Sequence, residues 1–254
     1  MIPSTRRQSG IDPRALWIVT FAFILTVTSF GKYEIARLTP LFLYPVAMTA
    51  FYGLPLREIG KRTLVVLPFI LLVGLFNPVF DRRALLEAGG FSLSGGWVSF
   101  ISIVLRSLLA VSSAILLALV SPFDRLCLGL EKMGVPRVLV TQLQFLHRYL
   151  FLLKGEAQRM IRAHHLRCPV NRPKIPMKVA SSMIGLLLLR AVDRATRIHW
   201  AMLVRGFDGE IRLQKPLSFS WARDGSFAAA WGLFFFLSRF VDLPGILSAW
   251  VVAR

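Results

Sequence analysis

The chain has 254 residues, of which 55% are hydrophobic and only 17% are charged, and its mean hydropathy is positive at +0.61. This composition is too apolar for an ordinary soluble domain, so membrane-spanning segments are the first elements to look for. The net charge of +18 would also suit a nucleic-acid-binding protein, but basic cytoplasmic loops that face anionic lipid explain it better in so apolar a chain.

Five apolar stretches are long enough, or nearly long enough, to cross a membrane. A helix needs about 20 apolar residues to cross about 30 Å of hydrocarbon, because it rises 1.5 Å per residue. The stretches are 15–30, 38–54, 64–80, 97–120 and about 222–241. We expect no secretory signal, because the first stretch has no small-residue cleavage pattern behind it. The sequence predicts an all-α integral membrane protein with about five spans.

The basic residues are concentrated in one part of the chain. Residues 121–215 contain seventeen Lys and Arg, and basic residues near span ends stay in the cytoplasm. We therefore expect this segment, the N-terminus and the turn at 55–63 to be cytoplasmic, with the C-terminus outside. Three regions follow from this reading. They are a membrane region over 1–120, a cytoplasmic region of long paired helices over 121–215, and a C-terminal membrane segment over 216–254.

Arg106 is a charged residue well inside the fourth predicted span. Helical spacing places Ser99, Ser102 and Ser113 on the same polar stripe. A charge at membrane depth faces protein or water, because the cost of exposing it to lipid is high. We interpret Arg106 as a residue that packs within the membrane region or contacts a partner, in preference to a direct role in transport.

The segment after the fourth span is too amphipathic to be a loop and too charged to be a span. A short helix is expected to end at Gly134, and a long helix follows with Pro136 in its first turn and runs to about Arg167. Leucines recur along the long helix at alternating intervals of four and three, which is typical of a helix that packs against another helix. These are Leu139, Leu143, Leu146, Leu150 and Leu153, and the same spacing continues to Ala157 and Met160.

A second long helix is expected from about Met177 to Arg205, after three prolines in "CPVNRPKIP". Gly206 offers the left-handed cap that ends it and leaves Arg205 in the last turn. Both long helices thus end in an arginine followed by a small residue and a break. Arginine is common in terminal turns, but two such endings on paired helices favour a shared function.

At these residues the sequence resembles the transmembrane coupling component (T component, CbiQ/EcfT family) of energy-coupling-factor (ECF) transporters, and within it the cobalt-type members. The resemblance covers most of the chain and is most specific in "RYLFLLKGEAQRMIRAHHLR" and "MLVRGFDG". In that family, two coupling helices end in short X-Arg-X motifs that dock into grooves of the ATPase subunits. The matching motifs here are Leu166-Arg167-Cys168 and Val204-Arg205-Gly206, with Leu166 and Val204 in place of the usual alanine.

The resemblance implies the coupling subunit of an ABC importer in the bacterial inner (cytoplasmic) membrane. Its partners would be two ABC-type ATPase subunits, which bind ATP and Mg, a substrate-capturing membrane protein that binds cobalt, and membrane lipid. Nickel or a vitamin stays open as the substrate. The residues agree that the chain itself is not an enzyme, because it has no glycine-rich phosphate loop ending in Gly-Lys-Ser/Thr.

We expect no metal site and no cofactor in this chain. The predicted spans have few acidic residues and no histidine, whereas hard or borderline cations need such ligands. His164 and Cys168 share a helical face beside His165, but we interpret this group as packing beside the docking arginine.

Two alternatives belong to other functional classes. "DGEIR" is superficially similar to motifs of membrane phosphotransferases, but Asp208 and Glu210 lack the acidic cluster that would hold a divalent metal. A non-transport scaffold that recruits partners or lipid through residues 121–215 is the other alternative. A transporter component should co-purify with nucleotide-binding proteins, and a scaffold need not.

Overall fold

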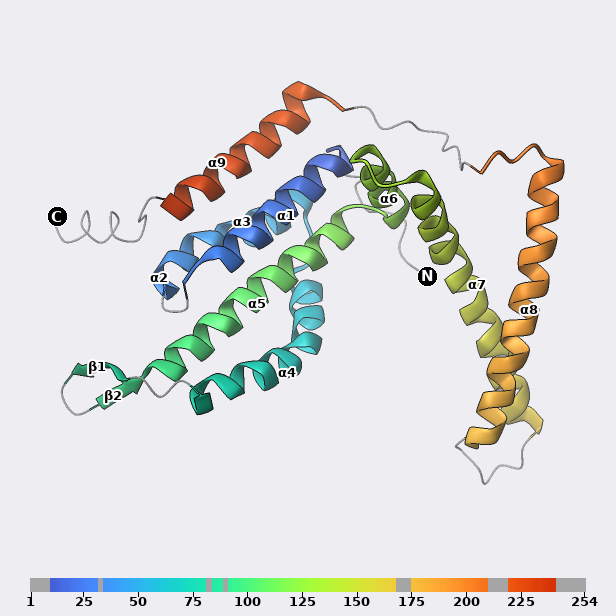
Figure 1. Ribbon diagram of the computed structural model, residues 1–254, viewed down its shortest axis with the longest axis horizontal. Helices are drawn as coiled ribbons and strands as arrows, with labels where there is room; N and C mark the ends of the chain where they lie inside the picture. The colour runs from blue at the N-terminus through green and yellow to red at the C-terminus, as the bar shows by residue number, and fades with distance from the viewer. Residues whose placement is uncertain are drawn as a thin grey trace. The chain divides into compact units, whose positions relative to one another are not determined.

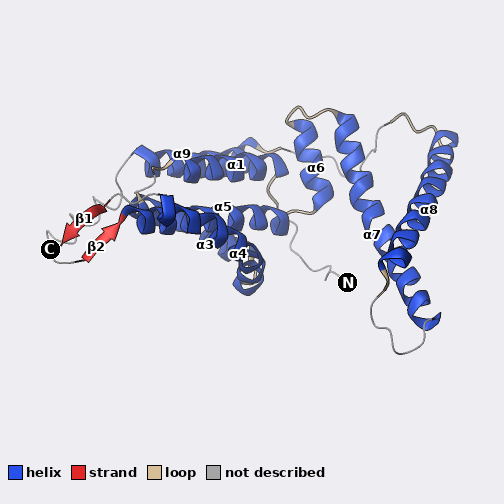
Figure 2. Cartoon of the chain, turned by 60° about the horizontal axis from the view of Figure 1, so that its bottom comes forward, coloured by secondary structure: helices blue, strands red, loops and turns tan. Residues whose placement is uncertain are grey.

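The computed structural model describes residues 10–31, 34–80, 84–88, 91–167, 175–209 and 219–240. Figures 1 and 2 show that the regular secondary structure of these residues is helical apart from one short hairpin. The chain divides into two compact units. The first unit comprises Met1–Gly129 with Leu217–Arg254, and the second comprises Leu130–Pro216.

The first unit contains the apolar helices. Its helices are α1 (Pro13–Ser29), α2 (Ile35–Leu38), the 3-10 helix η1 (Thr39–Phe42), α3 (Leu43–Tyr52), α4 (Leu56–Phe80), α5 (Gly95–Val120), the π-helical turn η2 (Trp221–Gly225) and α9 (Ser226–Phe240). α6 (Phe123–Lys132) begins in this unit and ends in the second.

Two described helices, α4 over Leu56–Phe76 and α5 over Gly96–Val120, are long and apolar enough to cross a membrane. α1 is apolar but has 17 residues, or about 25 Å of helix. The second predicted span is divided into α2, η1 and α3, because Pro40 lies in the first turn of η1 and interrupts the helical hydrogen bonding. The expected total of five spans stays a prediction.

The all-α expectation holds for the described residues with one addition. Between α4 and α5, the strands β1 (Ala84–Ala88) and β2 (Phe91–Ser94) pair antiparallel, with Ala88 opposite Phe91. The sequence there reads "ALLEAGGFSLS", and two glycines between short runs are a hairpin signal. That local signal is weak beside the long apolar runs on either side.

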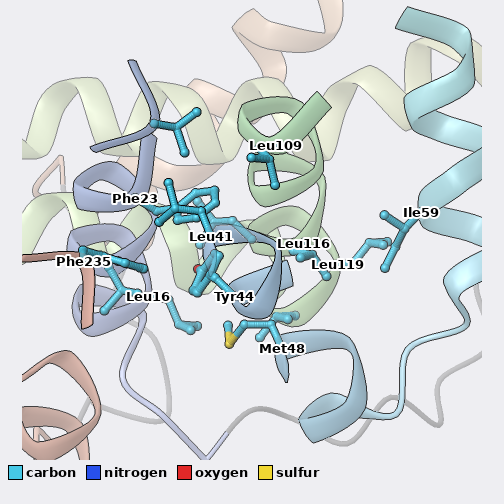
Figure 3. Packing of buried hydrophobic residues seen from close by; sticks show 14 of the residues in the cluster. Leu16, Phe23, Leu41, Tyr44, Met48, Ile59, Leu109, Leu116, Leu119 and Phe235 are labelled. Atoms are coloured by element: carbon cyan, nitrogen blue, oxygen red, sulfur yellow. The ribbon is translucent and has the colours of Figure 1, made fainter. Parts of the chain in front are cut away.

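The core of the first unit is built around aromatic side chains of α1, α3 and α9 (Figure 3). The ring of Phe23 lies 4.5 Å from that of Tyr44 and 5.4 Å from that of Phe235, centroid to centroid. Leu109 and Leu116 of α5 are buried in the same cluster. Such offset and tilted ring pairs add to the apolar burial that holds these helices together.

A buried carboxylate joins the start of the last helix to the start of the first. Asp224 is fully buried and accepts hydrogen bonds from the backbone N–H of Asp12 at 2.9 Å and of Ser220 at 2.8 Å. Asp12 in turn caps α1 by accepting from the N–H of Arg14 at 2.9 Å. Asp224 lies inside the fifth predicted span. Its carboxylate satisfies the backbone N–H groups of Asp12 and Ser220, which would otherwise lack a hydrogen-bond partner.

The second unit consists mainly of two long helices. They are α7 (Arg137–Arg167) and α8 (Met177–Val204), and they agree closely with the two long helices expected from the sequence. A proline precedes each helix, at Pro136 and at Pro176. Proline cannot continue a preceding helix but fits the first turn of a new one, which explains why these boundaries were readable from the sequence.

Candidate functional site

α7 and α8 form an antiparallel pair whose axes cross, hereafter the α7–α8 hairpin (Figures 1 and 2). α7 has 31 residues and α8 has 28, so the helices are about 46 Å and 42 Å long. Because the two helices run in opposite directions, the end of α7 with Arg167 and the start of α8 lie at the same end of the pair. Arg205 follows the other end of α8, so the two arginines lie at opposite ends of the hairpin.

The second predicted motif occupies a well-defined helix end. The N–H of Gly206 donates to the carbonyl of Leu203 at 2.9 Å, and the N–H of Phe207 donates to the carbonyl of Met202 at 3.0 Å. These two bonds are the Schellman pattern, and Gly206 has the left-handed φ of +75° that the pattern requires. The structure therefore places Arg205 at the C-cap of α8, one residue beyond the last helical residue.

An aromatic contact ties this corner to the other helix. The ring of Phe207 lies 6.4 Å from the ring of Phe145 on α7, which in turn stacks at 6.0 Å on Tyr149. The side chain of Val204, by contrast, is 88% exposed. The corner thus presents an exposed apolar residue and Arg205 to solvent, while Phe207 is held against α7.

The first predicted motif is described in part. Leu166 is 88% exposed and Arg167 is the last residue of α7, also exposed, whereas Cys168 lies outside the described residues. His164 and His165 precede them in the same turn, with ring centroids 6.1 Å apart. Within the described ranges no three His, Cys, Asp or Glu side chains gather as metal ligands would. The docking role of both motifs and the absence of a metal site stay predictions.

A carboxylate lies where α7 and α8 cross. Glu156 of α7 accepts a hydrogen bond from Arg159 at 2.5 Å through Oε2, and one from Arg190 of α8 at 2.7 Å through Oε1. The Glu156 side chain is only 18% exposed, while those of Arg159 and Arg190 are 60% and 51% exposed. Hydrogen bonds from Arg159, and to a smaller extent from Arg190, lower the pKa of Glu156 from its ordinary value, so the Glu156 carboxylate is charged at neutral pH.

Two grooves open between α7 and α8, on either side of this crossing. The large groove has a volume of about 420 Å³ and faces the Arg205 end. Its α7 wall ends at Leu153 and its α8 wall begins at Ala191. The small groove has a volume of about 160 Å³ and lies toward the Arg167 end. Both are mainly apolar, and no residue of α8 is buried along its length.

Arg106 lies in the first unit and makes a contact within the chain. Its Nη2 donates to the backbone carbonyl of Gly31, just beyond the C-terminal end of α1. A cation at that position suits the partial negative charge of the helix end. Ser99, Ser102 and Ser113 of the same helix are buried. A contact of Arg106 with another subunit stays a prediction.

Sequence reasoning missed three of these features. Glu156 and Arg190 are 34 residues apart, and the Glu156–Arg159 spacing of three was the only local signal. The Phe145–Phe207 contact is likewise long-range. Asp224 gave no signal beyond its presence in an apolar segment.

Comparisons with known proteins agree with this architecture. The CbiQ family, described as cobalt transport protein, matches residues 5–217 of the chain. An energy-coupling factor transporter transmembrane protein EcfT of Leuconostoc gelidum is 27% identical over 230 residues, which make up 84% of each protein. A cobalt transport protein CbiQ of Salmonella typhimurium is 27% identical over 158 residues, or 58% of this chain and 70% of that protein.

Two relatives without a described function come from Methanocaldococcus jannaschii. One is 28% identical over 187 residues, or 69% of this chain and 64% of that protein, and in the other the match spans 54% of its length. The chain therefore spans less than two thirds of these relatives. The match to CbiQ covers most of the present sequence and confirms the resemblance read from its motifs. The chain belongs to the CbiQ family of cobalt transport proteins, a family of transporter membrane components that are not enzymes by themselves.

Proposed function

We propose that this chain is the transmembrane coupling subunit of an ECF-type ABC importer. It transmits ATP-driven movements of two ATPase subunits to a separate substrate-capturing membrane protein. The observation that carries the proposal is the placement of Arg167 and Arg205 at opposite ends of one long helical hairpin. One element that presents two similar ends can engage two separate ATPase subunits at once.

Each end of the hairpin presents an arginine beside an exposed apolar side chain, which suits it to bind in a groove of a partner. An arginine guanidinium is a planar fork that binds carboxylates or carbonyls with two hydrogen bonds, and it stays charged at any physiological pH. Leu166 and Val204 stand beside the arginines and are each 88% exposed. Apolar side chains this exposed gain free energy when a partner's groove buries them. They replace the alanine usual in the family and would enlarge the apolar part of each end.

The division of labour follows from this arrangement. ATP and Mg would be bound by the partner ATPases, and the substrate by the separate membrane protein. The present chain would lie in the bacterial cytoplasmic membrane, with about five spans and with residues 121–215 on the cytoplasmic side. The two apolar candidate spans α4 and α5 and the basic composition of 121–215 support this topology.

Cobalt ion is the substrate we propose. The support comes from the family description and from the name of the Salmonella relative. Nickel or a vitamin would require the same coupling role with a different capturing protein. Metal-uptake measurements on the whole complex, with cobalt and nickel in competition, distinguish these substrates.

The docking role is tested by reversing both charges. In the double variant Arg167→Glu and Arg205→Glu, we expect the chain to remain in the membrane but to lose ATPase binding and at least 90% of ATP-driven uptake. The matched control is Arg197→Glu, an exposed arginine about two turns before the end of α8, which should retain both. Full uptake by the double variant would refute the docking role, and a non-transport scaffold would then be the better account.

A further inference from the structure

We propose that Glu156 is the positioning residue that fixes how α7 and α8 cross, and that it thereby sets the spacing of Arg167 and Arg205. The effect of Glu156 on transport rests on the function proposed above, but its effect on the crossing of α7 and α8 does not. Glu156 itself touches no part of the predicted motifs.

Glu156 bridges the two helices with both carboxylate oxygens engaged. Oε2 is held by Arg159 one turn along α7, and Oε1 accepts from Arg190 of α8. The bond to Arg159 restrains the Glu156 rotamer, so that Oε1 points at α8. Hydrogen bonds to charged groups are directional and stronger than neutral ones, so this arrangement favours one relative orientation of the helices.

The grooves show that this bridge marks the crossing point. On α7 the large groove ends at Leu153 and the small groove begins at Ala157, so Glu156 lies between them. On α8 the small groove ends at Leu187 and the large groove begins at Ala191, which leaves Arg190 between them. The helices therefore meet at Glu156 and Arg190 and separate in both directions.

Apolar packing gives this crossing little other restraint. No residue of α8 is buried, and the buried residues of α7 are Val140 and Gln144, near its first turns. Tightly interdigitated side chains normally select a helix-crossing angle. Here open grooves flank the contact, so a directional ion-pair network has more influence on the angle than it would in a packed core.

The two motifs lie far enough from the crossing for a small rotation to matter. Arg167 is eleven residues beyond Glu156 and Arg205 is fifteen residues beyond Arg190, or about 16 Å and 22 Å along the helices. A 10° change in crossing angle then displaces the ends by about 3 Å and 4 Å at that rise per residue. Bidentate contacts of arginine do not tolerate displacements of that size, since hydrogen bonds require donor–acceptor distances near 2.9 Å.

The test measures the crossing directly. Spin labels are placed at Ala163→Cys on α7 and Ser181→Cys on α8, both exposed, in full-length chain whose two native cysteines are replaced by serine. Pulsed electron paramagnetic resonance then gives the interspin distance distribution. We expect Glu156→Ala to broaden it at least twofold, and the charge exchange Glu156→Arg with Arg159→Glu and Arg190→Glu, which reverses every charge of the network, to restore most of the original width.

The control removes a similar ion pair elsewhere in the same unit. Glu131 in the last turn of α6 binds Arg137, the first residue of α7, at 3.2 Å and away from the crossing, and Glu131→Ala should leave the distribution unchanged. An unchanged distribution in Glu156→Ala would overturn the proposal. A broadened distribution that the charge exchange does not restore would also count against it, because simple loss of packing would produce that result.

Transport measurements separate this proposal from the function on which it rests. If both are correct, Glu156→Ala lowers ATP-driven uptake about tenfold in the assembled complex, and the charge exchange recovers it. If Glu156→Ala broadens the distance while the Arg167→Glu, Arg205→Glu variant transports normally, the positioning role stands and the proposed function fails. If the Arg167→Glu, Arg205→Glu variant abolishes uptake while Glu156→Ala leaves the distance distribution narrow, the proposed function stands and the positioning role fails.

Discussion

At the scale of single residues, Gly206 links local backbone geometry to the proposed docking surface. Its φ of +75° is the left-handed conformation that lets Phe207 turn back onto Phe145 while Arg205 projects at the helix end. Beyond Gly206 and its two chain neighbours, no atom lies within 4 Å of the position a Cβ would occupy, so space is not what demands glycine here. The demand comes from the backbone, because other residues reach this conformation at a cost.

We expect Gly206→Ala to weaken ATPase binding several-fold. The left-handed conformation costs an L-residue about 1 kcal/mol or more relative to glycine, so alanine shifts this corner toward other backbone conformations. The control is Gly185→Ala in the interior of α8, where alanine also has free space but favours the helix. Affinity measured with purified ATPase subunits checks this, and equal affinities of both variants and the parent chain would contradict it.

At the scale of the helices, the boundaries were predictable but the contacts between helices were not. α7 ends at Arg167 and α8 begins at Met177 as expected, because prolines stop one helix and start the next. α1 and α5 likewise agree with their apolar runs to within two residues. Hydrophobic periodicity carries that information locally.

Long-range polar contacts carry no such local signature. The Glu156–Arg190 pair and the hydrogen bond from Asp12 to Asp224, which are 34 and 212 residues apart, depend on where the helices lie in space. The candidate motifs were readable because each is a helix end with its own breaker residues. The hairpin geometry that places them at opposite ends became visible only in the fold.

The crossing of α7 and α8 should depend on pH in one direction. The guanidinium groups that face Glu156 are those of Arg159 and Arg190, and their hydrogen bonds lower its pKa in the folded chain. A carboxylate with a lowered pKa contributes stability that is fully present above its unfolded pKa, about 4.3. That contribution is lost as the pH falls through the lowered folded value.

We therefore expect the distance distribution between the labels at 163 and 181 to stay constant from pH 8 to about pH 5, because Glu156 is ionised over that range in both the folded and the unfolded chain. Below that range it should broaden as the carboxylate is protonated. The same labels in Glu156→Gln should give a broad distribution that changes little with pH. A distribution in the parent chain that broadens on raising the pH from 5 to 8 would contradict the assignment.

At the scale of the whole molecule, composition and charge were the strongest guides. The apolar and basic parts of the sequence predicted three regions, over 1–120, 121–215 and 216–254, whereas the chain forms two compact units, in which Leu217–Arg254 joins Met1–Gly129. The last helix belongs with the first unit because Phe235 and Asp224 pack among residues of α1 and α3. Hydropathy does not predict that the last helix packs against the first ones, because it shows which segments are apolar and not which segments contact one another.

The number of spans shows where hydropathy reaches its limit. α4 begins at Leu56, eight residues before its predicted span, and includes charged residues in its first turns. The second predicted span is interrupted at Pro40. Both departures arise because backbone hydrogen bonding, and not apolarity alone, decides where a helix begins and breaks.

The most direct test of the central claim is the composition of the complex isolated from native membrane in mild detergent, measured by native mass spectrometry. The account predicts one copy of this chain with two ABC-type ATPase subunits and a separate small membrane protein. It also predicts that the Arg167→Glu, Arg205→Glu variant loses the ATPases. Isolation of the parent chain alone, or with lipid-modifying enzymes and no ATPase, would contradict the claim that its helical hairpin couples ATP hydrolysis to transport.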